Sequence, residues 1–410
     1  MSKFLFATGA LSLFMTAAAP AFAQAGQLDP SFGSGGVVAS APLTLFTGAA
    51  LAPNGDIVMA GGAASTATFL RYLPNGSPDP SFGTGGVVSL PAPASFFLGE
   101  SFPLAMAVQS DGKILATFYA FNNTSTESEA LLIRLDTNGE LDATFGSGGQ
   151  VPLNFPTPAN FGASATRVVE QPDGKILVTG NLTPPFRSKS APLTLLARYL
   201  ANGELDSSFG TNGVSEVVTP VDLPVSLALL SGDGILALNN EGSIAVAQFS
   251  SSGALVTPAT GGTLVEAANL GDPIFAPNGE YLLGQSVAGT EGKTNVDAAV
   301  RKFEISGTAD TSFQSPTIRF APDAPGTKTL LTALAVDAKG RVIVGGELES
   351  ANFGSGVARL NANGSLDTSF GSNGIGAIVR GFTIFAVLVQ PDNRVIMFSG
   401  TGNLARYLAQ

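Results

Sequence analysis

The sequence predicts an all-β fold, a seven-bladed β-propeller with four antiparallel strands in each blade and the last blade closed by an N-terminal strand. Three observations lead to this fold. Three short motifs recur in a fixed order, the runs between them are short and apolar, and the unfinished last repeat is completed by residues near the N-terminus. Radial repetition of four short antiparallel strands is the architecture of a propeller.

The composition favours a packed, turn-rich chain over a helical or a disordered one. The 410 residues include Gly 50 and Pro 26, with 44% apolar and only 12% charged residues. The chain has no His and no Cys, so the usual zinc and haem ligands and the Ser-His and Cys-His nucleophile pairs are excluded. A net charge of −11 speaks against a nucleic-acid partner, because phosphate binding needs clustered Lys and Arg.

The N-terminal segment, residues 1–23, has the pattern of a cleavable export signal. Lys3 precedes an apolar run that ends at Met15, and small residues lead to Ala23. The run is short for a membrane span, and no later stretch reaches the roughly 18 apolar residues that a span needs. We expect cleavage between Ala23 and Gln24, a secreted or periplasmic bacterial protein, and no membrane span in the mature chain.

The first motif is a tight turn, x-[DN]-G with Pro often leading, between two apolar runs. Pro presets the helical φ of a type I turn, and Gly takes the left-handed position that follows. A three-residue hairpin loop is therefore expected between the first and second strands of each repeat. The turn occurs at residues 53–55, 110–112, 172–174, 232–234, 277–279, 338–340 and 391–393, with Lys339 in place of Asp or Asn in the sixth copy and Asn393 in place of Gly in the seventh.

The runs between motifs are predicted to be strands, because they are short, rich in Val, Ile, Leu and Phe, and bounded by turn residues. Residues 113–119 and 341–345 are typical. Each repeat then has one strand before the tight turn and one after it. A third strand ends in a basic residue, and a fourth follows the motif D-x-[ST]-F, as at residues 86–88.

The basic residue of the third strand and the Asp of D-x-[ST]-F are eight positions apart in every intact repeat. Such positions face each other across a three-residue hairpin loop, so we expect structural ion pairs. Alternatively, the Asp caps its own motif by accepting backbone N–H bonds. The fourth repeat has lost both members, with Gln248 and Val256 in the corresponding segments. The expected pairs are Arg71/Asp79, Arg134/Asp142, Arg198/Asp206, Lys302/Asp310 and Arg359/Asp367.

The two ends of the chain favour closure of the ring. The last repeat stops near Leu408, where its D-x-[ST]-F motif and fourth strand should follow, and those pieces occur at residues 29–32 and 36–38. We expect residues 24–40 to complete the seventh blade, so that residues 24–410 form one propeller without a free sheet edge. An open array of β-repeats is the alternative.

The motif strings resemble those of the bacterial delta-60 repeat family and, more loosely, those of NHL-type propellers. The strings that carry the resemblance are ALAVDAKGRVIVGG, VVEQPDGKILVTG, LARYLANGELDSSFGTNGV and ARLNANGSLDTSFGSNGI. The likeness covers nearly the whole mature chain and is weakest in the fourth and fifth repeats. It implies an exported propeller and no established shared activity.

Loop lengths separate the two predicted faces of the propeller. Successive D-x-[ST]-F motifs are 50, 63 and 64 residues apart from Asp29 to Asp206, and the extra length falls after the second and fourth strands. Variable loops on a rigid scaffold are usual recognition sites. The longest loops are expected at residues 91–103, 121–129, 156–166, 183–192 and 321–332. The candidate binding residues on them are Phe96, Phe97, Phe161, Phe186, Arg187 and Lys189.

These features favour an exported, non-enzymatic and monomeric binding or scaffold propeller without a cofactor. Its contact surface is expected on the long-loop face of blades 1 to 3, and its partner is a protein or a surface glycan or polymer. The alternative is a calcium-dependent, lactonase-like hydrolase or lyase, with carboxylates and calcium at the mouth of the central channel. The available carboxylates form no motif; they are Glu100, Glu127, Glu129, Glu170 and Asp272.

Overall fold

The computed structural model describes most of the chain from Gln24 to Ala409. The described ranges are residues 24–40, 43, 45–63, 66–90, 96–98, 105–122, 128–153, 155, 162–183, 193–217, 224–230, 234–240, 244–262, 274–276, 280–288, 296–320, 328–349 and 353–409. The candidate export signal lies outside them. No helix in the described part of the chain has the length and apolar character needed to cross a membrane.

Within the described residues the strands form seven antiparallel sheets, numbered here in chain order. Sheet 1 contains β2 (Leu45–Leu51), β3 (Ile57–Ala63), β4 (Thr66–Tyr72) and β5 (Val87–Leu90). Sheet 2 contains β6 (Phe96–Leu98), β7 (Ala105–Val108), β8 (Ile114–Asn122), β9 (Ser128–Leu135) and β10 (Gln150–Leu153). Sheet 3 contains β11 (Gly162–Glu170), β12 (Ile176–Thr183), β13 (Leu193–Tyr199) and β14 (Val214–Val217). Sheet 4 contains β15 (Pro224–Leu229), β16 (Ile235–Asn240), β17 (Ile244–Phe249) and β18 (Leu255–Gly262).

The last three sheets follow the same order along the chain. Sheet 5 contains β19 (Ile274–Phe275), β20 (Tyr281–Ala288) and β21 (Val296–Phe303). Sheet 6 contains β22 (Lys328–Val336), β23 (Val342–Glu349), β24 (Gly354–Leu360) and β25 (Val379–Arg380). Sheet 7 contains β26 (Ile384–Val389), β27 (Val395–Ser399), β28 (Leu404–Tyr407) and β1 (Val37–Val38).

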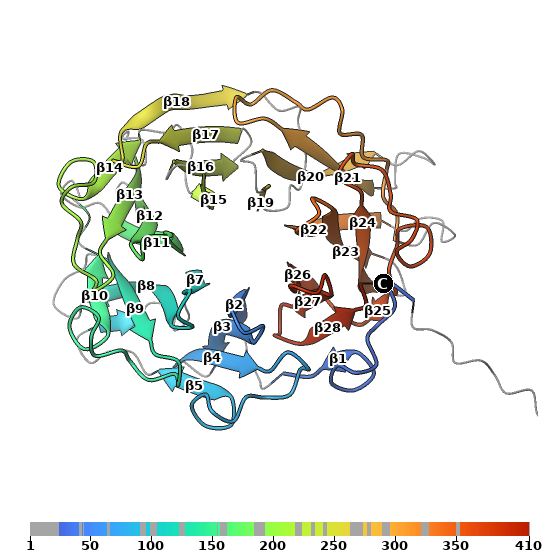
Figure 1. Cartoon of the computed structure of the whole chain (residues 1–410), viewed down its shortest axis with the longest axis horizontal. Coiled ribbons are helices and arrows are strands. Elements are labelled where there is room, and N and C mark those ends of the chain that lie inside the picture. The colour runs from blue at the N-terminus through green and yellow to red at the C-terminus, as the bar shows by residue number, and fades with distance from the viewer. Residues whose placement is uncertain are drawn as a thin grey trace, which may run out of the picture.

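The sheets are arranged radially around a common axis, which makes the fold an all-β propeller (Figure 1). The first strand of each sheet, such as β2 or β22, lies nearest the axis, and later strands lie successively further out. Strands that are neighbours in a sheet are also neighbours in the sequence, except where β1 joins β28 and where β6 joins β8. This meander places the turn after the first strand and the turn after the third strand on one face, which we call the tight-turn face.

Two sheets depart from the predicted four strands. In sheet 2, residues 96–98 form strand β6 and pair with β8, so the sheet has five strands. In sheet 5 the described residues give three strands, because Ile318 meets Ala298 only in an isolated bridge. Pro316 stands just before that bridge and has no N–H to extend the pairing.

Gly234, the last residue of the fourth tight-turn motif, is not in its predicted place. The Leu230 N–H donates to the Gly234 carbonyl, as the Gln109 N–H donates to the Lys113 carbonyl in sheet 2. Gly234 therefore occupies the place of Lys113, and its φ is not positive. The prediction that Gly234 fills the left-handed turn position is wrong, because the sequence offers two nearby glycines and only the hydrogen-bond register distinguishes them.

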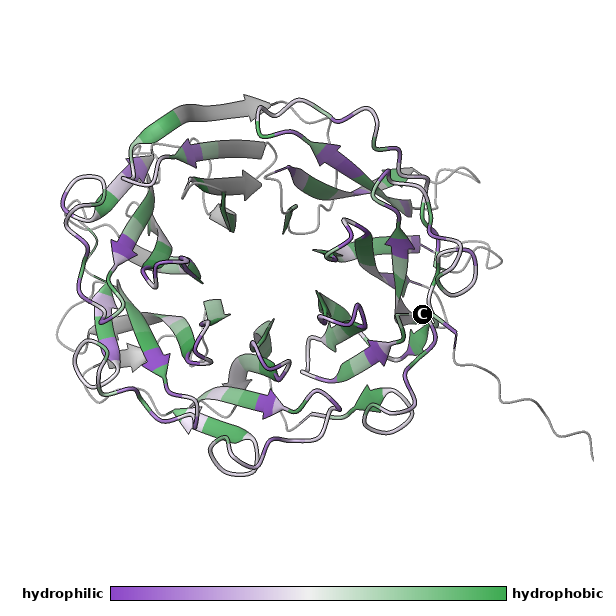
Figure 2. Cartoon of the chain, viewed as in Figure 1, coloured by the Kyte–Doolittle hydropathy of each residue, from purple (hydrophilic) through white to green (hydrophobic). Residues whose placement is uncertain are grey.

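The hydrophobic core is divided into clusters that lie between neighbouring sheets. One cluster joins sheets 1 and 2 through Phe69, Phe82, Phe118 and Leu131, and another joins sheets 7 and 1 through Phe32 and Phe398. Figure 2 shows apolar strands in green and a hydrophilic purple segment near the end of each third strand. The propeller is thus held together by inter-sheet packing, and each third strand ends in a polar group that needs a partner.

Residues 24–40 form part of sheet 7. Strand β1 pairs with β28, with Val37 opposite Ala405. Before β1, the Gly26 N–H donates to the Leu408 carbonyl at 3.0 Å. The N-terminal segment thus contributes the outermost strand of the sheet that contains the end of the chain (Figure 1).

Candidate functional site

A buried polar cluster stands at the end of the third strand in sheet 1. The Nε of Arg71 lies 2.6 Å from Oδ2 of Asp79. The other carboxylate oxygen, Oδ1, accepts hydrogen bonds from the backbone N–H and the hydroxyl of Ser81 at 2.9 and 2.7 Å. The two roles that the sequence leaves open for the Asp, ion pair and turn cap, are thus performed together by its two oxygens.

The same contact recurs at every intact repeat. Each Asp oxygen lies 2.6–3.2 Å from the facing basic nitrogen of Arg71/Asp79, Arg134/Asp142, Arg198/Asp206, Lys302/Asp310 and Arg359/Asp367. A sixth pair, Arg406 and Asp29, meets at 2.9 Å although 377 positions separate its members. Their spacing in the sequence does not reveal the pair, because the intervening turn is divided between two distant segments.

Each arginine of these clusters also binds the next sheet. The guanidinium of Arg71 lies 4.6 Å from the centroid of the Phe82 ring, and its Nη1 donates to the Thr137 carbonyl of sheet 2 at 2.6 Å. The ring supports the cation and the carbonyl satisfies one more of its donors. Equivalent bonds join Arg134 to Ala201, Arg198 to Ser251, Arg359 to Ala409 and Arg406 to Pro74. The recurring cluster therefore connects neighbouring sheets.

These bonds also show how the two ends of the chain rebuild one turn. Ala409 accepts from Arg359 as Ala201 accepts from Arg134. Ala25 accepts from the Gly371 N–H as Asn202 accepts from the Gly146 N–H. Ala409 and Ala25 therefore occupy adjacent positions of a turn that is continuous in sheet 3.

The aspartates of the clusters are held in their charged form. Burial alone would raise the pKa of Asp206, but hydrogen bonds from Ser208 and Arg198, together with the Arg198 charge, lower that pKa to about 2. At Asp310 the hydrogen bonds from Ser312 come first among the causes and lower its pKa to about 2. In the sequence, the only sign that a Ser lowers the pKa of the Asp is the [ST] position of the motif.

We expect acid to destabilise the protein between about pH 4 and pH 2. Because the folded pKa of Asp206 and its counterparts lies below the unfolded value of about 3.9, their stabilisation is complete above that value and is lost as the pH falls through the folded pKa. Melting temperatures measured from pH 5 to pH 2 should fall steeply in this window. The Asp206→Asn variant should show a shallower fall, and an unchanged slope would contradict this assignment.

A second cation approaches the motif aspartate in four of the sheets. The residue that follows the tight turn supplies it: Lys113 Nζ lies 3.2 Å from Asp142, and Arg394 Nε lies 3.2 Å from Asp29. Lys175 and Arg341 make the corresponding contacts in sheets 3 and 6. Sheets 1, 4 and 5 have Asp56, Gly234 and Glu280 at this position.

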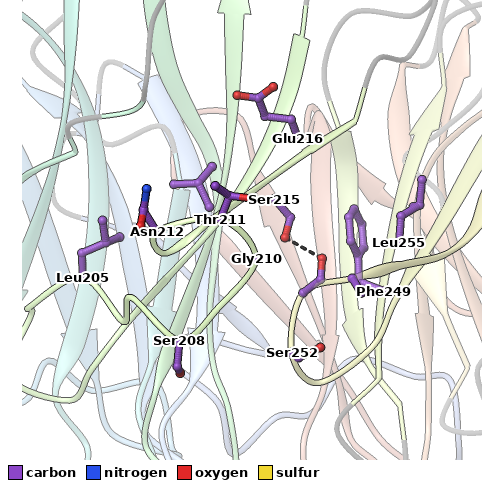
Figure 3. A pocket seen from close by; sticks show the side chains of 13 residues that line it. Leu205, Ser208, Gly210, Thr211, Asn212, Ser215, Glu216, Phe249, Ser252 and Leu255 are labelled. Carbon is purple, nitrogen blue, oxygen red and sulfur yellow. Dashed lines mark hydrogen bonds between the residues drawn. The ribbon is translucent and has the colours of Figure 1, made fainter.

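The boundary between sheets 3 and 4 is a groove of about 840 Å³ beside the repeat that lost its cluster. Strand β18 begins directly after the turn of sheet 4, so no D-x-[ST]-F segment covers this edge. Figure 3 shows the groove, with the Ser215 hydroxyl bonded to the Gly253 carbonyl at 2.6 Å. Leu255 is 44% exposed beside it, and Glu216 is the acidic residue of its lining. Both hydroxyl and apolar groups line the groove.

The structure places few of the sequence-predicted binding residues. Phe96 and Phe97 lie in strand β6 and pair with β8, so the prediction that residues 91–103 form one exposed loop is wrong. An apolar Phe-Phe-Leu run has high β propensity and continues the inner edge of sheet 2. Four candidates lie outside the described residues: Phe161, Phe186, Arg187 and Lys189.

Of the five carboxylates considered for a lactonase-like site, only two lie in the described part of the chain. Glu170 ends the inner strand β11, where its two oxygens accept from the Gln109 side chain at 2.8 Å and from the Ser110 N–H at 2.6 Å. Glu129 lies in strand β9, while Glu100, Glu127 and Asp272 fall outside the described residues. In the part of the chain that the structure describes, no group of three His, Cys, Asp or Glu side chains is placed to hold a metal ion.

Comparisons with known proteins support a propeller repeat family. A family model described as a domain of unknown function (DUF5122) beta-propeller matches residues 52–82, 109–145, 171–209 and 340–370. Each match ends at the Phe of a D-x-[ST]-F motif, and the first three contain a complete tight turn. A comparison with curated protein sequences finds no significant match.

Solved structures share the fold at low sequence identity. A streptogramin B lyase structure is 12% identical, with a TM-score of 0.51, and the match covers 91% of this chain and 96% of that one. The WD40 beta propeller domain of Doa1 is 10% identical, with a TM-score of 0.49 and coverage of 92% and 97%. The first of these likenesses supports the propeller fold.

Proposed function

We propose that the protein is an exported, non-enzymatic binding or scaffold propeller of the delta-60 repeat type. Its seven sheets are the blades of a closed ring, and residues 24–40 complete the seventh blade. Export uses residues 1–23, which are removed after Ala23. The ring acts as a monomer without a cofactor, and the long-loop face of blades 1 to 3 binds a protein or a surface glycan or polymer.

The observation that carries this proposal is that the recurring polar side chains on the tight-turn face hold the sheets together. There the recurring Arg, Asp, Ser and Phe side chains bind one another and the next sheet, as in the contact of Arg71 with Asp79 and Thr137. Side chains that hold the ring together are needed for stability, so they are not free to change to suit a particular ligand. The opposite face has segments of variable length, which suits recognition on a rigid scaffold.

Among the described residues, no specific contact favours the alternative of a calcium-dependent lactonase or lyase. It needs acidic side chains that meet at the mouth of the channel. Glu170, at the end of an inner strand, instead binds Gln109 and Ser110 of the neighbouring sheet. This use of the carboxylate is structural, and we therefore favour binding over catalysis.

Replacing Phe186, Arg187 and Lys189 together with Ala is expected to abolish partner binding and to leave the melting temperature nearly unchanged. Loops of this kind contribute little core but supply aromatic and Arg anchors to an interface. Binding is measured as capture of a protein or glycan from a bacterial envelope extract by the immobilised mature chain. Full capture by the triple variant would place recognition elsewhere.

The double variant Asn202→Ala, Gly203→Ala is the control on the opposite face. Gly203 has a φ of +90°, and an added Cβ would lie 2.7 Å from Cγ2 of Val151. The strained turn should lower the melting temperature, while the folded fraction should keep its partner affinity. Loss of binding without unfolding in this control would move the recognition surface to the tight-turn face.

A further inference from the structure

Sheet 1 lacks a cation that four other sheets possess. In sheets 2, 3, 6 and 7 the residue after the tight turn places a positive charge against the motif aspartate, as Lys113 does at 3.2 Å from Asp142. In sheet 1 this residue is Asp56. The repeats serve as internal references for one another, because the backbone turn before this position is the same, with a hydrogen bond from Gly55 to Ala52 as from Gly112 to Gln109.

The acidic replacement leaves sheet 1 with a buried, under-compensated charge. Asp56 is only 5% exposed, and its Oδ2 accepts from the Asn54 side chain at 2.7 Å. Arg71 Nε is 3.9 Å from Oδ2 of Asp56 and is already bonded to Asp79. In the described part of the chain no hydrogen bond reaches Oδ1 of Asp56. Two buried carboxylates therefore share one guanidinium, which is unfavourable unless a further cation approaches.

Three further contacts hold the guanidinium of Arg71 beside Asp79. Its Nη1 is bonded to the Thr137 carbonyl and its Nη2 to the Ser81 hydroxyl, while Phe82 supports its flat face. Sheet 5 shows the contrast, because its Glu280 and Asp310 flank the single ammonium of Lys302 at 2.6 and 3.2 Å. An ammonium can lie between two acids, whereas the guanidinium of sheet 1 is bonded to Asp79 and stays 3.9 Å from Asp56.

A groove of about 470 Å³ opens in front of these groups, between the tight turns of sheets 1 and 2. Its lining includes Asp56, Asp79, Asp111, Asn138 and Arg71. The position of Asp56 in this lining carries a long basic side chain in sheets 2, 3, 6 and 7. Asp111 is already paired with the Lys113 ammonium at 3.3 Å, so Asp56 and Asp79 share the single guanidinium of Arg71, and the net charge at that end of the groove is negative.

We propose that this groove binds a basic side chain of a partner protein, a Lys ammonium or an Arg guanidinium carried on an extended segment. The bound cation takes the place that the Lys113 ammonium takes in sheet 2 and satisfies Asp56 and Asp79. This surface lies on the tight-turn face and is independent of the proposed long-loop surface. A propeller with both surfaces can hold two partners on opposite sides of the ring.

The test uses the mature chain, with a hexalysine peptide as the probe at low ionic strength and isothermal titration calorimetry as the readout. In the Asp56→Lys variant the site carries its own ammonium, as in sheet 2, so the melting temperature should rise and peptide affinity should fall at least about tenfold. Asp56→Asn, which keeps the side-chain volume, should also lose affinity. If Asp56→Lys does not fold, the Asn variant alone decides.

Glu204→Lys is the matched control, because Glu204 is exposed in a turn of sheet 3 and the change in charge is identical. It should bind hexalysine almost as tightly as the parent chain. An equal loss in this control would show attraction to the overall negative charge only, and unchanged affinity in Asp56→Asn would also overturn the proposal. Calcium chloride is the competitor. If calcium displaces the peptide from the parent chain and binds more tightly than the peptide does, the groove is a metal site and the proposal is wrong.

Discussion

Deleting residues 24–40 is expected to remove at least about 5 kcal/mol of stability, which is comparable with the whole stability of a domain. The deletion takes away Phe32, which is fully buried, and leaves Arg406 buried without Asp29. It also exposes β28, whose four residues are all buried, as a free sheet edge. Size-exclusion chromatography and urea denaturation should show an unfolded or aggregated chain.

The milder variant Phe32→Ala keeps the expectation measurable if the deletion does not yield protein. It should cost about 3–5 kcal/mol in urea unfolding, because it empties a buried aromatic site between sheets 7 and 1. A deletion chain with the parent melting temperature would refute the role of residues 24–40.

A circular permutant provides the positive control. It joins Ala409 directly to Ala25 and opens the chain within residues 184–192, a predicted loop. The new peptide bond restores the spacing of eight positions between Arg406 and Asp29, as between Arg198 and Asp206. The permutant should fold with a stability close to that of the parent chain. Failure to fold would mean that the two ends do not share one repeat in this register.

Arg198→Ala is expected to lower the free energy of unfolding by about 3 kcal/mol. Arg198 is buried, contacts Asp206 at 2.8 Å, stacks 4.5 Å from the Phe209 centroid and bonds to the Ser251 carbonyl of sheet 4. Its removal leaves a buried carboxylate with weaker compensation and breaks an inter-sheet bond. Urea unfolding of the single and double variants measures the effect.

The double variant Arg198→Ala, Asp206→Ala should lose less than the sum of the two single losses, by at least about 1 kcal/mol. Strict additivity would show that the two residues are not coupled. Lys175→Ala is the control, because Lys175 also faces Asp206, at 3.4 Å, but is partly exposed. It should cost less than about 1 kcal/mol.

The repeat made much of the propeller predictable from sequence. Turn residues such as Asn54 and Gly55 marked the hairpins, and the spacing of eight positions placed Arg71 opposite Asp79. These features are local, because they depend on residues within one hairpin. The strand β6 escaped prediction, since Phe96 and Phe97 suit either a strand or an apolar loop and only the neighbouring β8 decides between them.

The contacts between sheets could not be predicted from the sequence, for a different reason. The bond from Arg71 to Thr137 ends on a backbone carbonyl, and every residue has one. Nothing in the residue type of Thr137 marks it as a partner. Asp56 could have been noticed in the sequence as an acidic residue at a position that is basic in other repeats. The groove beside it could not, because its opening depends on where the next sheet lies.

The divided turn between Ala409 and Ala25 sets an order of events in folding. Arg198 and Asp206 can meet as soon as one hairpin forms, whereas Arg406 and Asp29 are 377 positions apart and must wait for all the sheets between them. Closing a loop of that length from an unstructured chain costs roughly 3 kcal/mol more than closing one of eight residues, by the logarithmic dependence on length. Residues 24–40 precede every other strand of the propeller in the chain and are the last to find their place, so the slowest step of folding should be their docking onto an otherwise assembled protein.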